Sequence, residues 1–296
     1  MNIAAIDIGS NGARLLIKSF DAEAPEEARI RKQFFVRIPL RLGKDVFATG
    51  RISKERQRMM IHMMKAFRQF MLLYDVEEFR ACATSAMRDA DNGKKVMKRI
   101  RRETGIDLEI IPGAEEARLL CNNLVEYTSS GKGNFAYVDV GGGSTEVSLL
   151  HNGVLVESHS FNVGTLRMLS GGDIVPQMDA MQRMLETYNR EFPGTKVIGS
   201  GGNINRLYRL AGIKGEAREL PVVRLRELYE ALKPLSITER MERYKLKEDR
   251  ADVIIPAAEI FILVTSALQT DRIIVPNISL ADSIVDGMCR RWDNLR

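Results

Sequence analysis

The sequence predicts an α/β protein built from two related halves, and three patterns support this prediction. Apolar runs of strand length alternate with segments of helical periodicity along the chain, which is typical of α/β folds. Three strand-like runs end in glycine-rich turns, at Gly9–Gly12, Gly141–Gly143 and Gly199–Gly202. The run that contains Asp139 repeats the run that contains Asp7, at an offset of 139 − 7 = 132 residues. A pattern that occurs twice indicates a duplicated domain rather than a solenoid.

The first half begins with a predicted β-hairpin, formed by Ile3–Ile8 and Ala13–Phe20 with a glycine turn at its tip. Ser53 is a predicted N-cap, because the apolar residues that follow it recur at helical spacing as far as Met71. The other predicted elements of this half are an extended run that reaches Leu40–Gly43, a strand over Phe79–Thr84, a polar turn over Ser85–Asp89, a basic helix over Asn92–Thr104, a strand over Leu108–Ile111 and a helix over Glu115–Leu120.

The second half repeats the hairpin, with predicted strands over Ala136–Val140 and Glu146–Leu150 around Gly141–Thr145. The remaining predicted elements are a strand over Val154–Ser160, a helix after Pro176, a strand from Val197 to the third glycine turn, helices over Ile204–Ala211, Leu225–Leu232, Ile237–Tyr244 and Val253–Leu268, a strand over Asp271–Val275 and a closing helix from Leu280.

Composition places the chain among ordinary globular proteins. It has 296 residues, 45% of them hydrophobic and 28% charged, enough for two domains with buried cores. The net charge of +5 suits an anionic partner but is too small to identify one. Cys82, Cys121 and Cys289 are widely spaced and form no CxxC pair. This spacing argues against a zinc site or a disulfide framework and favours buried thiols in a reducing cytosol.

We expect a cytoplasmic protein with no membrane partner. The N-terminus enters an apolar run without a basic flank, and Asp7 interrupts that run. The longest later apolar stretch, Ile260–Leu268, is too short to span a bilayer. We also expect no nucleic-acid partner.

Three other kinds of site are excluded by inspection of the sequence. It contains no GxxxxGK[ST] phosphate loop, no GxSxG elbow and no GxGxxG fingerprint in a strand-turn-helix setting.

Glycine-rich turns at strand ends are natural phosphate cradles, because glycine lets successive backbone N–H groups approach an oxyanion. A single such turn is most often only a turn. Three together, two of them preceded by an aspartate at equivalent places, favour phosphate binding. The candidate phosphate-binding residues are Gly9, Ser10, Asn11, Gly12, Gly141, Gly142, Gly143, Ser144, Thr145, Gly201 and Gly202.

Acidic residues next to two of these turns predict a metal site. Asp7 and Asp139 each end an apolar strand, where an unpaired carboxylate is costly unless it faces a cleft or an ion. Together with Glu146, they would form an oxygen-rich site suited to Mg²⁺ or another divalent cation that carries phosphate. The alternative is that each aspartate caps its own turn.

Other charged residues allow two interpretations each. By spacing alone, Glu115 and Glu116 only complement the dipole of their predicted helix. The three histidines show no grouping, so a carboxylate must act as the general base if the protein is a hydrolase. Arg88 is either a phosphate clamp or an exposed turn arginine. The basic run Lys94–Arg102 is usually a solvated helix face, but it could equally track a polyanion.

These segments together resemble the exopolyphosphatase and guanosine pentaphosphate phosphohydrolase family. The resemblance is ordered, covers nearly the whole chain and rests on Asp7–Asn11, Leu40–Gly43, Thr84–Arg88, Gly113–Arg118, Asp139–Glu146, Gly199–Gly202 and Val275–Ile284. It implies the fold of the sugar kinase, heat-shock and actin superfamily: an α/β, duplicated actin-like fold with a central cleft. The implied domains are residues 1–121 with 280–296, and residues 122–279.

The resemblance also implies roles for individual residues. Glu115 would be the catalytic base, and Asp139 and Glu146 would position water and magnesium. Arg88 would stabilise charge on the transferred phosphoryl group. Two departures stand out. Gly12 occupies a position where the family usually has serine, and the chain ends without the C-terminal histidine-aspartate helical domain of longer members. It therefore resembles the short, two-domain members.

The activity implied by the resemblance is release of terminal phosphate from inorganic polyphosphate by metal-assisted attack of water. Hydrolysis of the 5′ phosphate of guanosine pentaphosphate is the alternative, and the sequence does not separate the two. Gly12 also motivates a non-catalytic regulator that binds the alarmone or the polymer, although the presence of Glu115, Asp139 and Glu146 argues against it. A kinase or filament on this fold would leave the Glu-Glu-Ala-Arg segment without a role. A homodimer is expected only from the general frequency of two-fold assemblies.

Overall fold

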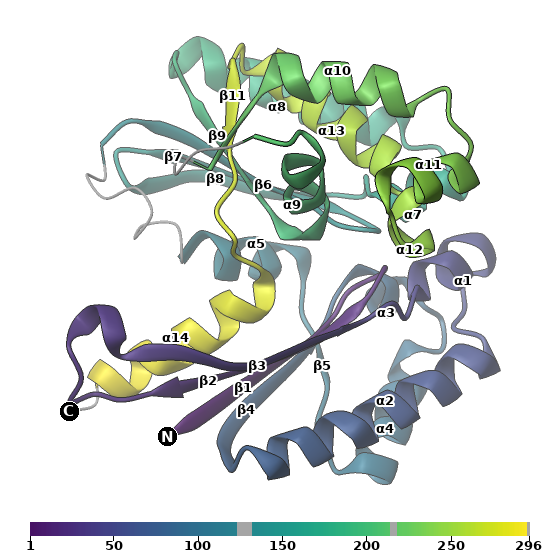
Figure 1. The fold of residues 1–296 in the computed structure, drawn as a ribbon, viewed down its shortest axis with the longest axis vertical. Helices are drawn as coiled ribbons and strands as arrows, with labels where there is room; N and C mark the ends of the chain where they lie inside the picture. Colours follow the sequence, from purple (N-terminus) through teal and green to yellow (C-terminus); the bar gives the residue numbers. More distant parts are fainter. Residues whose placement is uncertain (123–131, 214–217, 295–296) are drawn as a thin grey trace. The chain divides into compact units, whose positions relative to one another are not determined.

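The computed structural model describes residues 1–122, 132–213 and 218–294, and the chain divides into two compact units (Figure 1). Unit 1 comprises Met1–Asn123 and Leu280–Arg296, and unit 2 comprises Leu124–Ser279. Each unit has its own mixed β-sheet, its own helices and its own apolar core. The predicted α/β class is therefore confirmed.

The sheet of unit 1 has the strand order β3-β2-β1-β4-β5. Strand β1 (Asn2–Ile8) pairs antiparallel with β2 (Ala13–Phe20), as the hairpin prediction required, and β2 pairs antiparallel with β3 (Ile30–Ile38). On its other edge β1 pairs parallel with β4 (Val76–Ala83), which pairs parallel with β5 (Glu109–Ile110).

The sheet of unit 2 has the order β10-β11-β9-β6-β7-β8 and repeats this plan. Five strands reproduce the antiparallel and parallel pairings of unit 1, and a sixth extends one edge. This repetition confirms the duplication predicted from the 132-residue offset. The strands are β6 (Asn134–Val140), β7 (Thr145–His151), β8 (Val154–Phe161), β9 (Lys196–Ser200), β10 (Glu219–Pro221) and β11 (Arg272–Ile274).

The long helix of unit 1 begins as predicted, because the Ser53 hydroxyl accepts a hydrogen bond from the Arg56 amide. Its apolar face, which includes the fully buried Phe67, packs into the core of the unit. The helices of unit 1 are η1 (Glu26–Ala28), α1 (Leu42–Thr49), α2 (Lys54–Leu73), α3 (Ser85–Asp89), α4 (Gly93–Thr104), α5 (Gly113–Asn122) and α14 (Leu280–Asn294).

Two predictions for unit 1 were wrong. The extended run stops at Ile38, and Arg41 adopts a left-handed conformation (φ 55°) that turns the chain into α1. The segment Ser85–Asp89 is a short helix rather than a polar turn. The amides of Met87 and Arg88 both donate to the Thr84 carbonyl, and burial of the Met87 side chain holds this single helical turn in place.

The helices of unit 2 include every helix predicted there, together with the short α7 and α12. Helix α13 is apolar almost all round and lies in the core of the unit, which explains its long apolar run. In the described part of the chain, none of the helices combines the length and the apolar character that crossing a bilayer requires. The helices are α7 (Thr165–Leu169), α8 (Val175–Glu191), α9 (Gly201–Leu210), α10 (Val222–Leu232), α11 (Ile237–Tyr244), α12 (Glu248–Ala251) and α13 (Ile254–Ala267).

Candidate functional site

The glycine turn between β6 and β7 is held from behind by the start of α7. An amide-to-carbonyl bond from Gly141 to Ser144 (2.9 Å) closes the turn. Three successive carbonyls of the turn accept hydrogen bonds from the α7 segment. These bonds run from Thr165 N to Gly141 O (3.0 Å), from Leu166 N to Gly142 O (2.7 Å) and from Arg167 Nε to Gly143 O (2.7 Å).

This arrangement fixes the direction of the next amides. The described chain contains no cis peptide bond, so the N–H of each peptide points opposite to its carbonyl. The N–H groups of Gly142, Gly143 and Ser144 therefore point away from α7, and none of them has an acceptor among the described residues. Such a row of donors is suited to an oxyanion.

Gly164 permits this close approach, and sequence reasoning missed it. A Cβ on Gly164 would lie 2.5 Å from the backbone nitrogen and carbonyl carbon of Gly143. Any other residue at position 164 would push α7 away from the turn. The signal in the sequence was weak, because α7 is too short to produce a helical period.

The turn between β1 and β2 has the same construction in unit 1. The amide of Gly9 donates to the carbonyl of Gly12 (3.1 Å), the equivalent of the Gly141–Ser144 bond. The amides of Gly43 and Arg41 donate to the carbonyls of Ser10 (2.8 Å) and Asn11 (3.0 Å). The N–H groups that follow these two carbonyls again point away from the supporting segment.

Side chains in this turn are also engaged. The Ser10 hydroxyl lies 2.8 Å from the hydroxyl of Ser85 at the start of α3. A Cβ on Gly12 would lie 3.0 Å from Nη2 of Arg37 and 3.0 Å from the carbonyl oxygen of Ile38. The arginine of the neighbouring strand thus occupies the space that a side chain at position 12 would need.

The two hairpins differ in the charge opposite the strand-end aspartate. Asp7 is buried and faces Arg14 in the β1–β2 register, and the Arg14 guanidinium donates to its carboxylate. Asp139 faces Glu146 at the equivalent place in the β6–β7 register. One predicted metal ligand therefore has a cationic partner, whereas the other two are acids on opposing residues.

The Asp139–Glu146 pair lies beside the third glycine turn. Asp139 pairs with Ser200 across β6 and β9, and a Cβ on Gly201 would overlap Oδ1 of Asp139. Glu146 is buried, and its Oε1 accepts a hydrogen bond from the Ser160 hydroxyl (2.7 Å). The fold of unit 2 thus brings both acids and two of the predicted glycine turns together.

Arg250 is a further candidate that sequence reasoning missed. A Cβ on Gly202 would lie 2.6 Å from Nη2 of Arg250, so the guanidinium covers the glycine turn. Arg250 Nη1 donates to Oδ1 of Asn203 (3.1 Å), whose amide group donates to the carbonyl of Val140 (2.8 Å). Arg250 belongs to the unpredicted helix α12 and lies 47 residues after Asn203. Because the two residues are so far apart along the chain, no local pattern indicated the contact.

Glu115 stands in the first turn of α5, and Arg80 on β4 holds its side chain. Arg80 Nη2 donates to Oε1 of Glu115 (2.7 Å), and Arg80 Nε donates to Glu109 (2.5 Å). The Glu115 side chain is 29% exposed, so solvent still reaches the carboxylate. Sequence reasoning missed Arg80, because its role depends on two strands and a helix meeting.

Arg88 and Glu116 form a second contact at the start of α5. Nη1 of Arg88 donates to the carbonyl of Ile111 (2.8 Å) and lies 3.7 Å from a carboxylate oxygen of Glu116. Glu116 is buried, whereas Glu115 is half-buried. The two neighbouring acids therefore have different environments, a distinction that the spacing could not reveal.

The prediction that the three cysteines are buried is confirmed. Cys82, Cys121 and Cys289 are all buried free thiols. Burial raises the pKa of each thiol, to about 11 for Cys289. These thiols are protonated near neutral pH, which makes them poor nucleophiles.

Asp139 and Glu146 fit the oxygen chemistry of a magnesium site. In the described residues, no group of three or more His, Cys, Asp and Glu side chains is placed to hold a metal ion. Magnesium is commonly held through one or two carboxylates together with substrate phosphates, so two facing acids suffice. Asp7 fits less well, because the Arg14 guanidinium already offsets its charge.

Comparison with known proteins relates the chain to one family of phosphatases. A sequence model of the Ppx/GppA phosphatase family matches residues 35–291. Exopolyphosphatase 1 of Mycobacterium tuberculosis is 31% identical over 148 residues, which are 50% of this chain and 42% of that protein. The matched region thus spans less than half of that relative's length. The guanosine-5′-triphosphate,3′-diphosphate pyrophosphatase of Aeromonas hydrophila is 22% identical over 298 residues, covering 96% of this chain and 59% of that protein.

A solved structure shares the fold. The crystal structure of an exopolyphosphatase from Cytophaga hutchinsonii superimposes with a TM-score of 0.83 over 98% of both chains, at 24% sequence identity.

Proposed function

The chain belongs to the Ppx/GppA phosphatase family, and on this premise we propose that it is a hydrolase that releases terminal phosphate from inorganic polyphosphate. The observation that carries the proposal is the pair of equivalent glycine turns, each with backbone N–H groups directed away from its support. Such donors suit phosphate oxygens without distinguishing one phosphate from the next, as a repeating polymer requires.

In this proposal a water molecule attacks the terminal phosphorus, and the bond to the bridging oxygen breaks. Free phosphate leaves, and the polymer is one unit shorter. Glu115 accepts the proton of the water at a carboxylate oxygen. Arg80 supports this role, because its hydrogen bond to Oε1 limits the rotation of the carboxylate and positions it.

In this proposal the glycine turns bind the phosphate oxygens. In unit 2 the backbone N–H groups of Gly142, Gly143 and Ser144 would bind phosphate oxygens. In unit 1 the equivalent N–H groups of Asn11 and Gly12 are suited to the same kind of ligand. The hydroxyl of Thr145 donates to the Val163 carbonyl (2.6 Å), so that residue would contribute through its backbone. Arg88 would offset charge on the transferred group, since among the described residues its partners contact Nη1 and leave its other nitrogens to bind phosphate.

Asp139 and Glu146 would hold Mg²⁺ or a similar cation, which would neutralise phosphate charge and orient the oxygens. The facing register of the two acids supports this part of the proposal. A cation bound between two facing carboxylates would offset their mutual repulsion. Ser160 would orient Glu146 through its hydroxyl.

The test is phosphate release from long-chain polyphosphate in the presence of magnesium by the native protein and by Glu115→Gln. The matched control is Glu109→Gln, which removes the other carboxylate that Arg80 binds. We expect activity to be lost in Glu115→Gln and largely kept in Glu109→Gln. Equal activity of native protein and Glu115→Gln would refute the proposed base.

Guanosine pentaphosphate is the second candidate substrate, because a relative named as a pyrophosphatase of this nucleotide matches 96% of the chain. The same assay with the nucleotide decides between them by the ratio of kcat/KM for the two substrates. Binding of either substrate without phosphate release would instead support a non-catalytic regulator. The cytoplasmic location and the homodimer stay predictions.

A further inference from the structure

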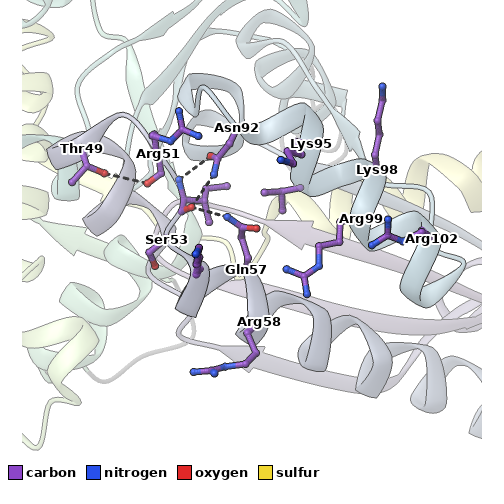
Figure 2. A pocket seen from close by; sticks show the side chains of 13 residues that line it. Thr49, Arg51, Ser53, Gln57, Arg58, Asn92, Lys95, Lys98, Arg99 and Arg102 are labelled. Atoms are coloured by element: carbon purple, nitrogen blue, oxygen red, sulfur yellow. Dashed lines mark hydrogen bonds between the residues drawn. The ribbon is translucent and has the colours of Figure 1, made fainter.

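A basic pocket lies in unit 1 at the end of α1, the start of α2 and the exposed side of α4 (Figure 2). Its volume is about 870 Å³. Seven of its thirteen lining residues are lysine or arginine, and none of the thirteen is acidic. The pocket therefore concentrates positive charge in a chain whose net charge is only +5. None of the residues assigned above to the phosphate turns or to catalysis lines it.

Most of this charge is not neutralised within the protein. Arg99 donates to Glu103 (2.7 Å), and Arg102 lies 3.7 Å from the same carboxylate. The remaining cations have no ion pair among the described residues. These cations are Arg51, Lys54, Arg58, Lys95 and Lys98. Exposed like charges repel one another unless an anion lies between them, so the pocket is suited to a polyanion.

The pocket wall is fixed rather than loose. The backbone of Ile52 exchanges two hydrogen bonds with the Asn92 side chain, both 2.9 Å, and also accepts one from Gln57 (2.9 Å). These bonds, drawn in Figure 2, tie the segment that carries Arg51 to the beginning of α4. Part of the cost of ordering the site is therefore already met in the folded protein.

The lining favours a bare phosphate chain over a nucleic acid. Proteins that bind single-stranded nucleic acid generally stack the bases on aromatic side chains. The pocket lining contains no aromatic residue, and its apolar members are Ile52 and Val96. Lysine and arginine at intervals along α4 can contact phosphate oxygens, and the pocket supplies no aromatic platform on which successive bases could stack.

The pocket is connected to the first phosphate turn through α1. The amide of Gly43, at the start of α1, binds the carbonyl of Ser10 in that turn, and Thr49 at the end of α1 lines the pocket. Gly43 and Thr49 are six residues apart, which is roughly 9 Å along the helix axis. A ligand that occupies both must be extended and anionic along its length.

We propose that this pocket is a second binding site for polyphosphate, which holds a segment of the polymer away from the reacting end. The proposal rests on the proposed function and adds to it a preference for long chains. Tripolyphosphate that is held at the phosphate turns would not use the pocket. Long chains would use both sites at once, which raises their apparent affinity through effective concentration.

The test compares Lys95→Ala/Lys98→Ala with the control Lys65→Ala/Arg68→Ala. The control removes the same charge from exposed positions of α2 that do not line the pocket. We expect the pocket variant to raise KM for long-chain polyphosphate on the order of fivefold, with kcat and the KM for tripolyphosphate unchanged. The rise should shrink at high salt. Equal KM changes for both substrates, or for both variants, would overturn the proposal.

A binding measurement separates failure of the pocket from failure of the proposed function. Fluorescently labelled long-chain polyphosphate is titrated with each protein in the absence of magnesium, which suppresses turnover under the proposed function, and fluorescence anisotropy gives the dissociation constant. Weaker binding by the pocket variant alone supports the pocket even if no phosphate is released. Unchanged polyphosphate binding with weakened binding of single-stranded RNA would identify a nucleic-acid surface and overturn the proposal.

Discussion

The guanidinium of Arg14 binds the carboxylate of Asp7 directly across the β1–β2 hairpin. The same place in the second hairpin holds Asp139 opposite Glu146. The duplication thus preserved the backbone and the strand-end aspartate while the charge opposite it was reversed. Asp7 therefore has a cationic partner directly opposite it, whereas Asp139 has a second carboxylate opposite it. If the second pair holds the proposed cation, the two hairpins are expected to differ in their dependence on metal.

We expect Glu146→Gln to raise the magnesium concentration for half-maximal activity on the order of tenfold, because one of two facing carboxylate ligands is lost. Stabilisation of the fold by magnesium, measured as a shift in Tm, should weaken in parallel.

The matched control for this prediction is Asp7→Asn. It should lower the free energy of unfolding by about 2 kcal/mol, since the ion pair between Asp7 and Arg14 loses its carboxylate, while the magnesium requirement is unchanged. Equal metal requirements in all three proteins would contradict the assignment.

Arg80→Gln should reduce kcat on the order of tenfold with little change in KM, because the Glu115 carboxylate loses the hydrogen bond that positions it. Arg80→Lys should restore part of the activity through a single ammonium contact. Steady-state kinetics on polyphosphate measures both. A rise in KM alone would mean that Arg80 acts on substrate binding instead.

Gly12→Ser should destabilise the protein by about 1 kcal/mol, because the new Cβ crowds the Arg37 guanidinium and the Ile38 carbonyl. Removing the guanidinium in Gly12→Ser/Arg37→Ala should relieve part of this cost. Chemical unfolding of both single variants, the double variant and the native protein gives the coupling energy. A coupling energy of zero would show that the Arg37 side chain moves aside without cost and would contradict the proposed crowding.

Gly164→Ala should cost about 2 to 3 kcal/mol of stability and most of the activity, since its Cβ would lie 2.5 Å from the Gly143 backbone. The control is Gly172→Ala, where a Cβ meets no atom within 4 Å and no left-handed conformation is involved. Thermal unfolding and phosphate release are measured for both. Normal activity of Gly164→Ala would show that support by α7 is not needed.

The Arg80–Glu109 contact predicts a pH effect on stability. The hydrogen bond that Arg80 donates to Glu109 is the main reason why the pKa of Glu109 lies below its ordinary value of 4.5. A lowered carboxyl pKa adds stability above 4.5, and this contribution disappears as the pH falls through the folded-state pKa. Glu109 is 48% exposed, so the contribution is below about 1 kcal/mol. Urea unfolding should show the difference between native protein and Glu109→Gln narrowing below pH 4.5, and a constant difference would exclude this origin.

The sequence alone determined the elements whose signals are local. Each hairpin consists of two strands around a glycine-rich turn. A few neighbouring residues specify the strands and the turn, so the sequence pattern predicts the hairpin. The 132-residue offset revealed the duplication, because equivalent strands need equivalent patterns. The Ser53 cap and α2 were predictable for the same reason: the N-cap and the apolar period lie within one segment.

Only the tertiary structure decided which side chains meet. Glu115 meets Arg80 across 35 residues, Arg167 meets Gly143 across 24, and Arg250 meets Asn203 across 47. None of these contacts leaves a pattern within one segment, because each depends on how strands and helices pack. The sequence therefore determined where the strand-end turns and their acids stand along the chain. The packing decided which of those acids is neutralised, which is positioned and which stands opposite another acid.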